Sequence, residues 1–136
     1  MLSFVKNQNR DNMIFDIYGK QIDGKLIFEL PYYRFEYREE IAITHLVVEW
    51  KSAREKVFAY LDTSLVDLGP ENPKQQLVAF TKPGGTSITD IRMNPVFYDV
   101  QIQQMDEATF KIKSMFGKPL PEIKNVYCQL ITVSDT

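Results

Sequence analysis

Hydrophobic and polar residues alternate with a period of two along much of this chain. In residues 110–113 Phe and Ile alternate with lysines, and residues 33–38 alternate aromatic with charged side chains. This period is typical of a β-strand with one buried face, because successive side chains of a strand point to opposite faces of a sheet. Residues 125–133 are apolar on both parities, which predicts a strand covered on both faces. Residues 41–50 switch parity midway, which predicts a β-bulge near Thr44 and His45.

Turn-forming residues separate these runs. Asp23 and Gly24 form the strongest hairpin signal, since both tolerate a positive φ. Gly- and Pro-rich loops are predicted at 69–73, 82–86 and 116–121. Helical signals are confined to a turn or two at 52–58 and 106–108. The predicted strands are about 13–18, 25–30, 33–38, 41–50, 56–62, 76–81, 97–103, 108–114 and 125–133.

Many short strands at this spacing predict an all-β chain folded as an antiparallel β-sandwich or barrel, with fewer than about 15% of residues helical. A chain of 136 residues buries about two-thirds of its surface, which is enough for one core, so we predict one domain over residues 1–136. Five residues inside apolar runs are predicted to be largely buried, namely Trp50, Phe97, Phe110, Ile112 and Leu130.

The charge balance narrows the range of partners. Sixteen basic against eighteen acidic residues give a net charge of −2, so there is no clear signal for nucleic-acid binding, although folding can still assemble a local basic patch. No apolar run approaches the roughly 18 residues that span a bilayer. The first seven residues turn polar too early for a signal peptide, so we expect an intracellular protein.

Few residues of this chain are suited to catalysis. The single histidine, His45, could act as a general base beside Glu49 or Asp62, or activate the single cysteine, Cys128. Both lie in strand-like runs, which favours a hydrogen-bonded or packed His45 and a small, buried Cys128. One cysteine permits no intramolecular disulfide, and one histidine permits no three-histidine metal site.

The acidic and glycine-rich motifs favour solvated turns over active sites. The carboxylate pairs Glu39-Glu40 and Asp106-Glu107 fall where turns are predicted. The glycine-rich stretch 82–87 lacks the Lys-Ser/Thr ending and the helix of a phosphate-binding loop, so a turn with two glycines at positive φ is favoured. We therefore expect no enzyme and no cofactor. A loop calcium site stays open among the aspartates Asp62, Asp67, Asp90 and Asp99.

The second half of the chain carries a family resemblance. Residues 57–67, the loop 69–73, the Pro-aromatic run 94–100, the run 110–112, the Gly-x-Pro stretch 117–121 and the apolar run 126–130 follow one another in order. That order resembles the closing half of the jelly-roll capsid proteins of Polinton-like and adintovirus-like double-stranded DNA viruses. The resemblance spans about residues 57–133. It implies a single jelly roll of about eight strands with no catalytic residues.

Two functions follow from these observations. The resemblance implies a structural virion protein, of the penton type or a minor or cement protein, that assembles in the host cell interior with copies of itself and with other capsid proteins. Major capsid proteins of that group carry two jelly rolls, whereas this chain has room for one. The alternative is a β-sandwich binding module that recognises a carbohydrate or protein through its loops. The predicted interface residues are Gly69, Pro70, Glu71, Asn72, Pro73, Lys82, Pro83, Gly84 and Gly85.

Overall fold

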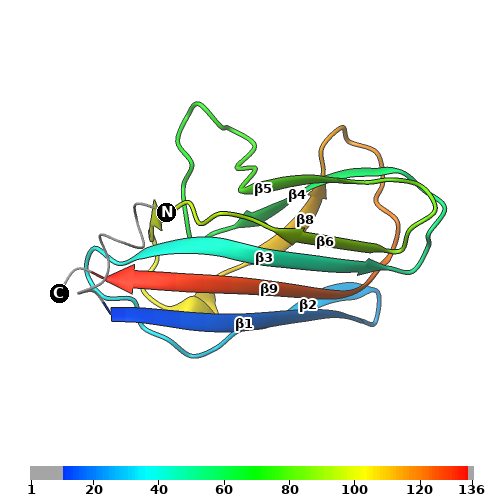
Figure 1. The fold of residues 1–136 in the computed structure, drawn as a ribbon. Coiled ribbons are helices and arrows are strands. Elements are labelled where there is room, and N and C mark those ends of the chain that lie inside the picture. The colour runs from blue at the N-terminus through cyan, green and yellow to red at the C-terminus, as the bar shows by residue number, and fades with distance from the viewer. Residues whose placement is uncertain (1–10, 135–136) are drawn as a thin grey trace.

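The computed structural model describes residues 11–134, which form nine strands and one short 3-10 helix (Figure 1). The start of the chain, on which the expectation about a signal peptide depends, lies outside these residues. No helix within residues 11–134 is long and apolar enough to cross a membrane. The elements are β1 (Asp11–Ile22), β2 (Lys25–Glu29), β3 (Glu40–Trp50), β4 (Val57–Thr63), β5 (Val78–Lys82), β6 (Ile88–Arg92), β7 (Tyr98–Asp99), η1 (Met105–Glu107), β8 (Phe110–Ser114) and β9 (Ile123–Ser134).

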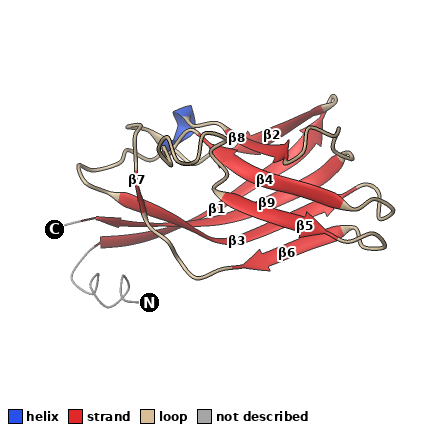
Figure 2. Cartoon of the chain, turned by 90° about the horizontal axis from the view of Figure 1, so that it is seen from above, coloured by secondary structure: helices blue, strands red, loops and turns tan. Residues whose placement is uncertain are grey.

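The strands form two antiparallel sheets that pack face to face (Figure 2). The large sheet has the order β2-β1-β9-β3-β6, with β7 paired to the start of β3. The small sheet has the order β5-β4-β8. The predicted all-β antiparallel sandwich is therefore confirmed.

The pairing of the strands is nested along the sequence. β4 pairs with β5 at the centre, β3 with β6 around them, and β1 with β9 on the outside. An isolated antiparallel β-bridge between Arg34 and Gln104 lies inside the β1–β9 pair and outside the β3–β6 pair in this nesting. A long antiparallel ribbon that folds over on itself in this way is a jelly roll. β2 is an addition to that plan, because a tight hairpin joins it to the edge of β1.

Two local predictions are confirmed by the backbone. Asp23 and Gly24 form the turn between β1 and β2 with φ values of 50° and 81°, and Ile22 pairs with Lys25 across it. The register of β3 against β9 shifts between Ile43 and His45, which is the predicted bulge. The bulge changes the parity of β3, so apolar residues on both sides of it face the core.

The core lies between the two sheets. Trp50, Phe110 and Leu130 are buried there, as predicted. Ile112 is only partly buried because β8 is an edge strand of the small sheet. Phe97 is also only partly buried, since it precedes the two-residue strand β7 and lies outside any longer strand.

Some predicted elements differ in the structure. Residues 33–38 form no strand: Arg34 makes an isolated bridge, Tyr37 and Arg38 form a turn with Arg38 at a φ of 65°, and the other residues are irregular. Their partner in the nested ribbon is residues 103–105, which enter η1 and cannot extend the ladder. Residues 97–103 keep only β7, because Val100 N donates to Glu39 and Gln101 N to Leu65, which belong to different segments.

The two helical signals have different outcomes. Residues 52–56 form a loop without helix, and β4 begins at Val57. The second signal corresponds to η1. β6 has no counterpart in the predicted set, since Asp90 and Arg92 interrupt its short apolar pattern. Its pairing with β3 across more than 40 residues of sequence creates it.

Candidate functional site

The large sheet has one face against the small sheet and an outer face that no other described strand covers. Several large apolar side chains on this outer face are exposed, each between 43% and 65%. They come from β1, β2 and β6, and they are Ile14, Tyr18, Ile22, Ile27 and Ile88. Single exposed apolar residues are normal on a soluble protein, but several on one face mark an interaction surface.

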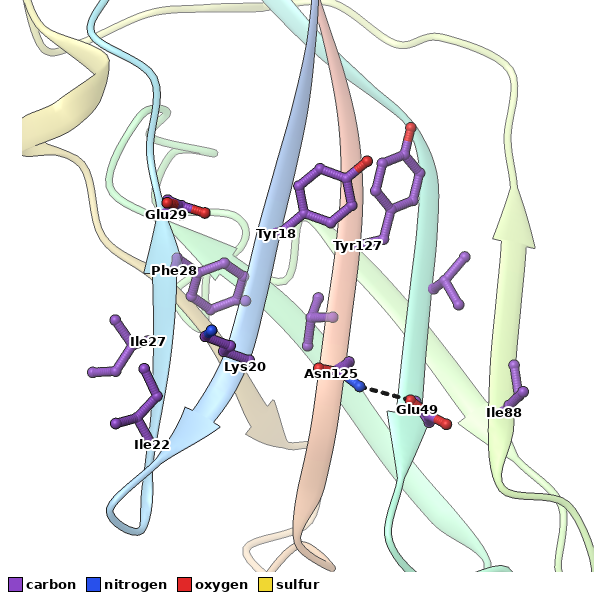
Figure 3. A pocket seen from close by; sticks show the side chains of 13 residues that line it. Tyr18, Lys20, Ile22, Ile27, Phe28, Glu29, Glu49, Ile88, Asn125 and Tyr127 are labelled. Atoms are coloured by element: carbon purple, nitrogen blue, oxygen red, sulfur yellow. Dashed lines mark hydrogen bonds between the residues drawn. The ribbon is translucent and has the colours of Figure 1, made fainter.

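The outer face is hollowed at the half that lies near the β1–β2 turn (Figure 3). The hollow has a volume of about 730 Å³. The rings of Tyr18 and Tyr127 lie 5.2 Å apart at its side, and Ile22, Ile27 and Ile88 border it. The right-handed twist of a sheet bends its corners out of plane, which makes such a depression on one face.

A few polar groups line the same hollow. Asn125 Nδ2 donates to Glu49 Oε1 over 2.8 Å, between β9 and β3. Lys20 and Glu29 also line it, from β1 and β2. An apolar hollow with a small number of fixed polar groups is the usual composition of a binding surface.

A row of side-chain contacts crosses the outer face beside this hollow. Tyr127 Oη donates to Asp16 Oδ1 over 2.5 Å, and this hydrogen bond is the main cause that raises the pKa of Tyr127 to about 12. The ring of His45 lies edge-on to Tyr127, with 5.3 Å between centroids. His45 Nε2 lies 2.7 Å from Asp90 Oδ1 on β6. These contacts fix the Tyr127 ring between its neighbours.

His45 is therefore a hydrogen-bonded strand residue, as the sequence favours, but with a different partner. The carboxylate that contacts His45 is that of Asp90, not that of Glu49 or Asp62. Cys128 is also out of reach as its partner, because Cys128 pairs with Leu46 on the core side of the sheet.

Cys128 is fully buried in the core, as predicted. Burial raises the pKa of its thiol to about 12. The thiolate is the nucleophilic form of cysteine, so this residue is held in its unreactive state.

We predict that Cys128 in the native protein does not react with a chromogenic disulfide reagent at pH 8 within an hour. In 6 M guanidinium chloride one thiol per chain is expected to react within minutes. Absorbance of the released thiolate measures both reactions. Rapid labelling of the native protein, at a rate close to that of the unfolded chain, would show that the β1–β9–β3 core is open.

Glu39 corrects the prediction that the first carboxylate pair is solvated. Its side chain is buried, and its two oxygens accept from Tyr33 Oη over 2.5 Å and from Glu36 N over 2.7 Å. Burial, followed by the hydrogen bond to Glu39, raises the pKa of Tyr33. Glu39 thus closes a local turn and does not face an open cleft. The second pair, Asp106 and Glu107, is exposed on η1 as predicted.

The aspartates that left a loop calcium site open are dispersed. Asp62 pairs with Lys113 over 2.8 Å, and Asp90 contacts His45. Asp67 Oδ1 accepts from Gly69 N and from Gln75 Nε2 within its own loop. Among the described residues, no group of three His, Cys, Asp or Glu side chains gathers in a way that could hold a metal ion.

The two predicted interface loops lie at opposite ends of the sandwich (Figure 1). Pro70, Glu71 and Pro73 are exposed in the β4–β5 connection, and Gly69 and Asn72 are partly exposed. Pro83, Gly84 and Gly85 are exposed in the β5–β6 connection at the other end. No single contact surface contains both loops, and their role in an interface stays a prediction.

The prediction that Lys82 belongs to an interface is corrected, because its side chain is fully buried and cannot contact a neighbouring molecule. Four backbone carbonyls lie within hydrogen-bond distance of its ammonium, which has three N–H donors to share among them, and these include Thr86 O at 2.8 Å and Ala53 O at 3.4 Å. The other two acceptors are Glu55 O and Pro83 O. Lys82 therefore ties the β3–β4 loop to the β5–β6 loop.

The two glycines of that loop are needed for different reasons. Gly85 has a φ of 94°, as expected for a turn glycine. At Gly84 a Cβ atom would lie 2.9 Å from Arg54 O, so close approach of the two loops excludes a side chain there. The prediction of positive φ is right for Gly85 alone.

No family model, curated protein or solved structure matches the chain. Function is therefore inferred from the residues and the geometry described above. The main feature missed at the sequence level is the outer face of the large sheet. Its signal is present in residues 13–18 and 25–30, where apolar side chains occur on both parities although only one face is covered.

Proposed function

We propose that this protein is a structural subunit of a virion shell, a single jelly-roll capsid component of the penton, minor or cement type. It works by association with copies of itself and with other capsid proteins, and it catalyses no reaction. The observation that carries the proposal is the apolar outer face of the large sheet. The jelly-roll topology and the sequence resemblance of residues 57–133 support the same function.

The outer face is large enough to hold a neighbour. Its five main strands contain 45 residues, and each residue occupies about 3.4 by 4.8 Å of a sheet, which gives about 730 Å². A standard protein interface buries about 800 Å² on each partner. A neighbouring copy that covers this face therefore comes close to the size of a standard interface and removes Tyr18, Ile27 and Ile88 from water.

Self-association is the test of this proposal. At tens of micromolar chain in physiological salt, sedimentation velocity is expected to show oligomers well above the 15.9 kDa monomer, and electron microscopy is expected to show rings or shells. The variant Ile27→Lys/Ile88→Lys places two charges on the outer face and is expected to sediment as a monomer with an unchanged far-ultraviolet spectrum. The matched control Tyr32→Lys/Tyr37→Lys changes two exposed side chains elsewhere and is expected to assemble normally.

A clear negative result is available. A wild-type chain that stays at 15.9 kDa at every concentration, and that also fails to join particles when co-expressed with a shell protein, would contradict the proposal. It would then favour the binding module.

The binding module is supported by one specific observation. The hollow of the outer face combines the adjacent rings of Tyr18 and Tyr127 with Lys20, Glu49 and Asn125, which suits a ligand that has both apolar faces and hydroxyl groups, such as a carbohydrate. In this function the wild-type chain is a monomer, and Tyr18→Ala weakens retention of the protein on a glycan array. The binding site is then a sheet face, whereas the sequence predicts a site formed by loops.

A further inference from the structure

The net charge of −2 conceals a strong polarity between the two ends of the sandwich. At one end lie the turn 23–25 and the segments 51–56, 82–87 and 115–124 (Figure 1). Together they carry seven basic and three acidic side chains, namely Lys25, Lys51, Arg54, Lys56, Lys82, Lys118 and Lys124 against Asp23, Glu55 and Glu122. We call this the basic end.

The opposite end has the reverse charge. It consists of the segments 30–40, 64–77 and 93–109. These carry eight acidic and three basic side chains, which are Glu36, Glu39, Glu40, Asp67, Glu71, Asp99, Asp106 and Glu107 against Arg34, Arg38 and Lys74. The basic end therefore attracts polyanions while the opposite end repels them.

An exposed aromatic ring lies in a hollow at the basic end. This hollow, of about 410 Å³, lies between the start of β4 and the β8–β9 loop, and Lys56, Phe58, Phe116 and Lys118 line it. Phe116 is 68% exposed and meets the ring of Phe58 edge-on at 5.3 Å. Lys56 Nζ lies 5.2 Å from the centroid of Phe58. One carboxylate, Glu55, also lines the hollow.

The loop that carries Arg54 and Lys56 is held in place by backbone contacts. Gly85 N donates to Ala53 O over 2.6 Å, and the buried ammonium of Lys82 donates to Ala53 O and Glu55 O. The cationic side chains therefore project from an ordered loop. This lowers the entropic cost of binding a ligand there.

From these contacts we propose that the basic end binds single-stranded nucleic acid. One base stacks on the free face of Phe116, and the phosphates on either side of it lie against Lys56, Lys118 and Arg54. A positively charged groove with an aromatic ring on which a base stacks is the general design of such sites. Duplex DNA fits less well, because its bases are already stacked and cannot reach the ring.

Fluorescence anisotropy of a labelled 20-nucleotide oligothymidylate tests the proposal. The protein used is the Ile27→Gln/Ile88→Gln variant, which disrupts the apolar outer face without adding charge, so that self-association does not contribute. At 20 mM salt this protein is expected to bind the strand. A plot of the logarithm of the affinity against the logarithm of the salt concentration is expected to have a slope of about −2, because each of three neutralised phosphates contributes about −0.7. Phe116→Ala is expected to weaken binding about tenfold, within the range measured for loss of one base–aromatic stack.

Matched controls separate a built site from general charge attraction. Tyr37→Ala removes a similarly exposed ring at the opposite end of the sandwich and is expected to leave the affinity unchanged. Lys56→Gln/Lys118→Gln is expected to reduce the slope by about 1.4, whereas Lys74→Gln/Lys111→Gln, which removes the same charge elsewhere, leaves it unchanged. Thermal melts confirm that each variant is folded.

Three results would overturn the proposal: no binding at 20 mM salt, equal affinity for Phe116→Ala and Tyr37→Ala, or binding to heparin and duplex DNA as tight as to the single strand. Binding itself does not depend on the shell function, since it is measured on the unassembled protein.

Discussion

Replacing Trp50 with alanine is expected to lower the free energy of unfolding by about 3–5 kcal/mol, the usual cost of truncating a buried aromatic side chain. Trp50 ends β3 on the core face of the large sheet and is buried. Its ring lies 6.5 Å from that of Phe80 in the small sheet, and its Nε1 donates to Thr89 Oγ1 over 3.0 Å. One side chain thus joins β3, β6 and the small sheet. Urea unfolding followed by circular dichroism measures the loss.

Two control variants separate packing from hydrogen bonding in this experiment. Thr89→Val removes the acceptor and keeps the shape of the side chain, so it is expected to cost about 1 kcal/mol plus the penalty of an unpaired indole N–H. Tyr37→Ala removes an exposed ring and is expected to change the stability by less than about 0.5 kcal/mol. An unchanged urea midpoint for Trp50→Ala would show that β3 does not end in the core.

Lys82→Met is expected to destabilise the protein by about 2–5 kcal/mol, since each buried polar group that loses its partner costs about 1–3 kcal/mol. Methionine matches the length of the lysine stem but carries no donor. The carbonyls of Glu55 and Thr86 then lose their bond to the ammonium in the interior between the two loops. Ala53 O keeps its bond from Gly85 N, so the loss is restricted to part of the cluster.

Thermal and urea unfolding of Lys82→Met measure this effect, with Lys74→Met as the control. Lys74 is an exposed loop lysine, and its replacement is expected to change stability by less than about 0.5 kcal/mol. Hydrogen exchange of Gly85 N–H offers a second measurement, because this donor lies at the loop contact that Lys82 supports. Equal stability of the two variants, with equal protection of Gly85, would contradict the role of the Lys82 ammonium.

The sequence by itself determines the features that depend on neighbouring residues. The turn at Asp23-Gly24 follows from two residues that accept a positive φ, and the bulge near Thr44 follows from a change of parity within one run. The strand at 125–133 and the burial of Cys128 follow from apolar residues on both parities. These signals are local, so no knowledge of the strand partners is needed to read them.

Pairing partners decide the features that the sequence alone does not predict. Residues 33–38 have the alternation of a strand, yet they lack a partner of the same length. β6 has a weak pattern, yet β3 supplies a full set of backbone partners. A ladder forms only where two segments can satisfy each other's backbone groups, and that depends on the whole topology.

The tertiary structure alone also decides where individual charges lie. Glu39 and Lys82 belong to charged, turn-like stretches that are normally solvated, but Tyr33 and Glu36 enclose the first and four backbone carbonyls enclose the second. The charge polarity and the apolar outer face arise in the same way. Alternate strands reverse direction, so segments distant in sequence meet at one end of the sandwich, and only the completed pairing determines which side chains share a surface.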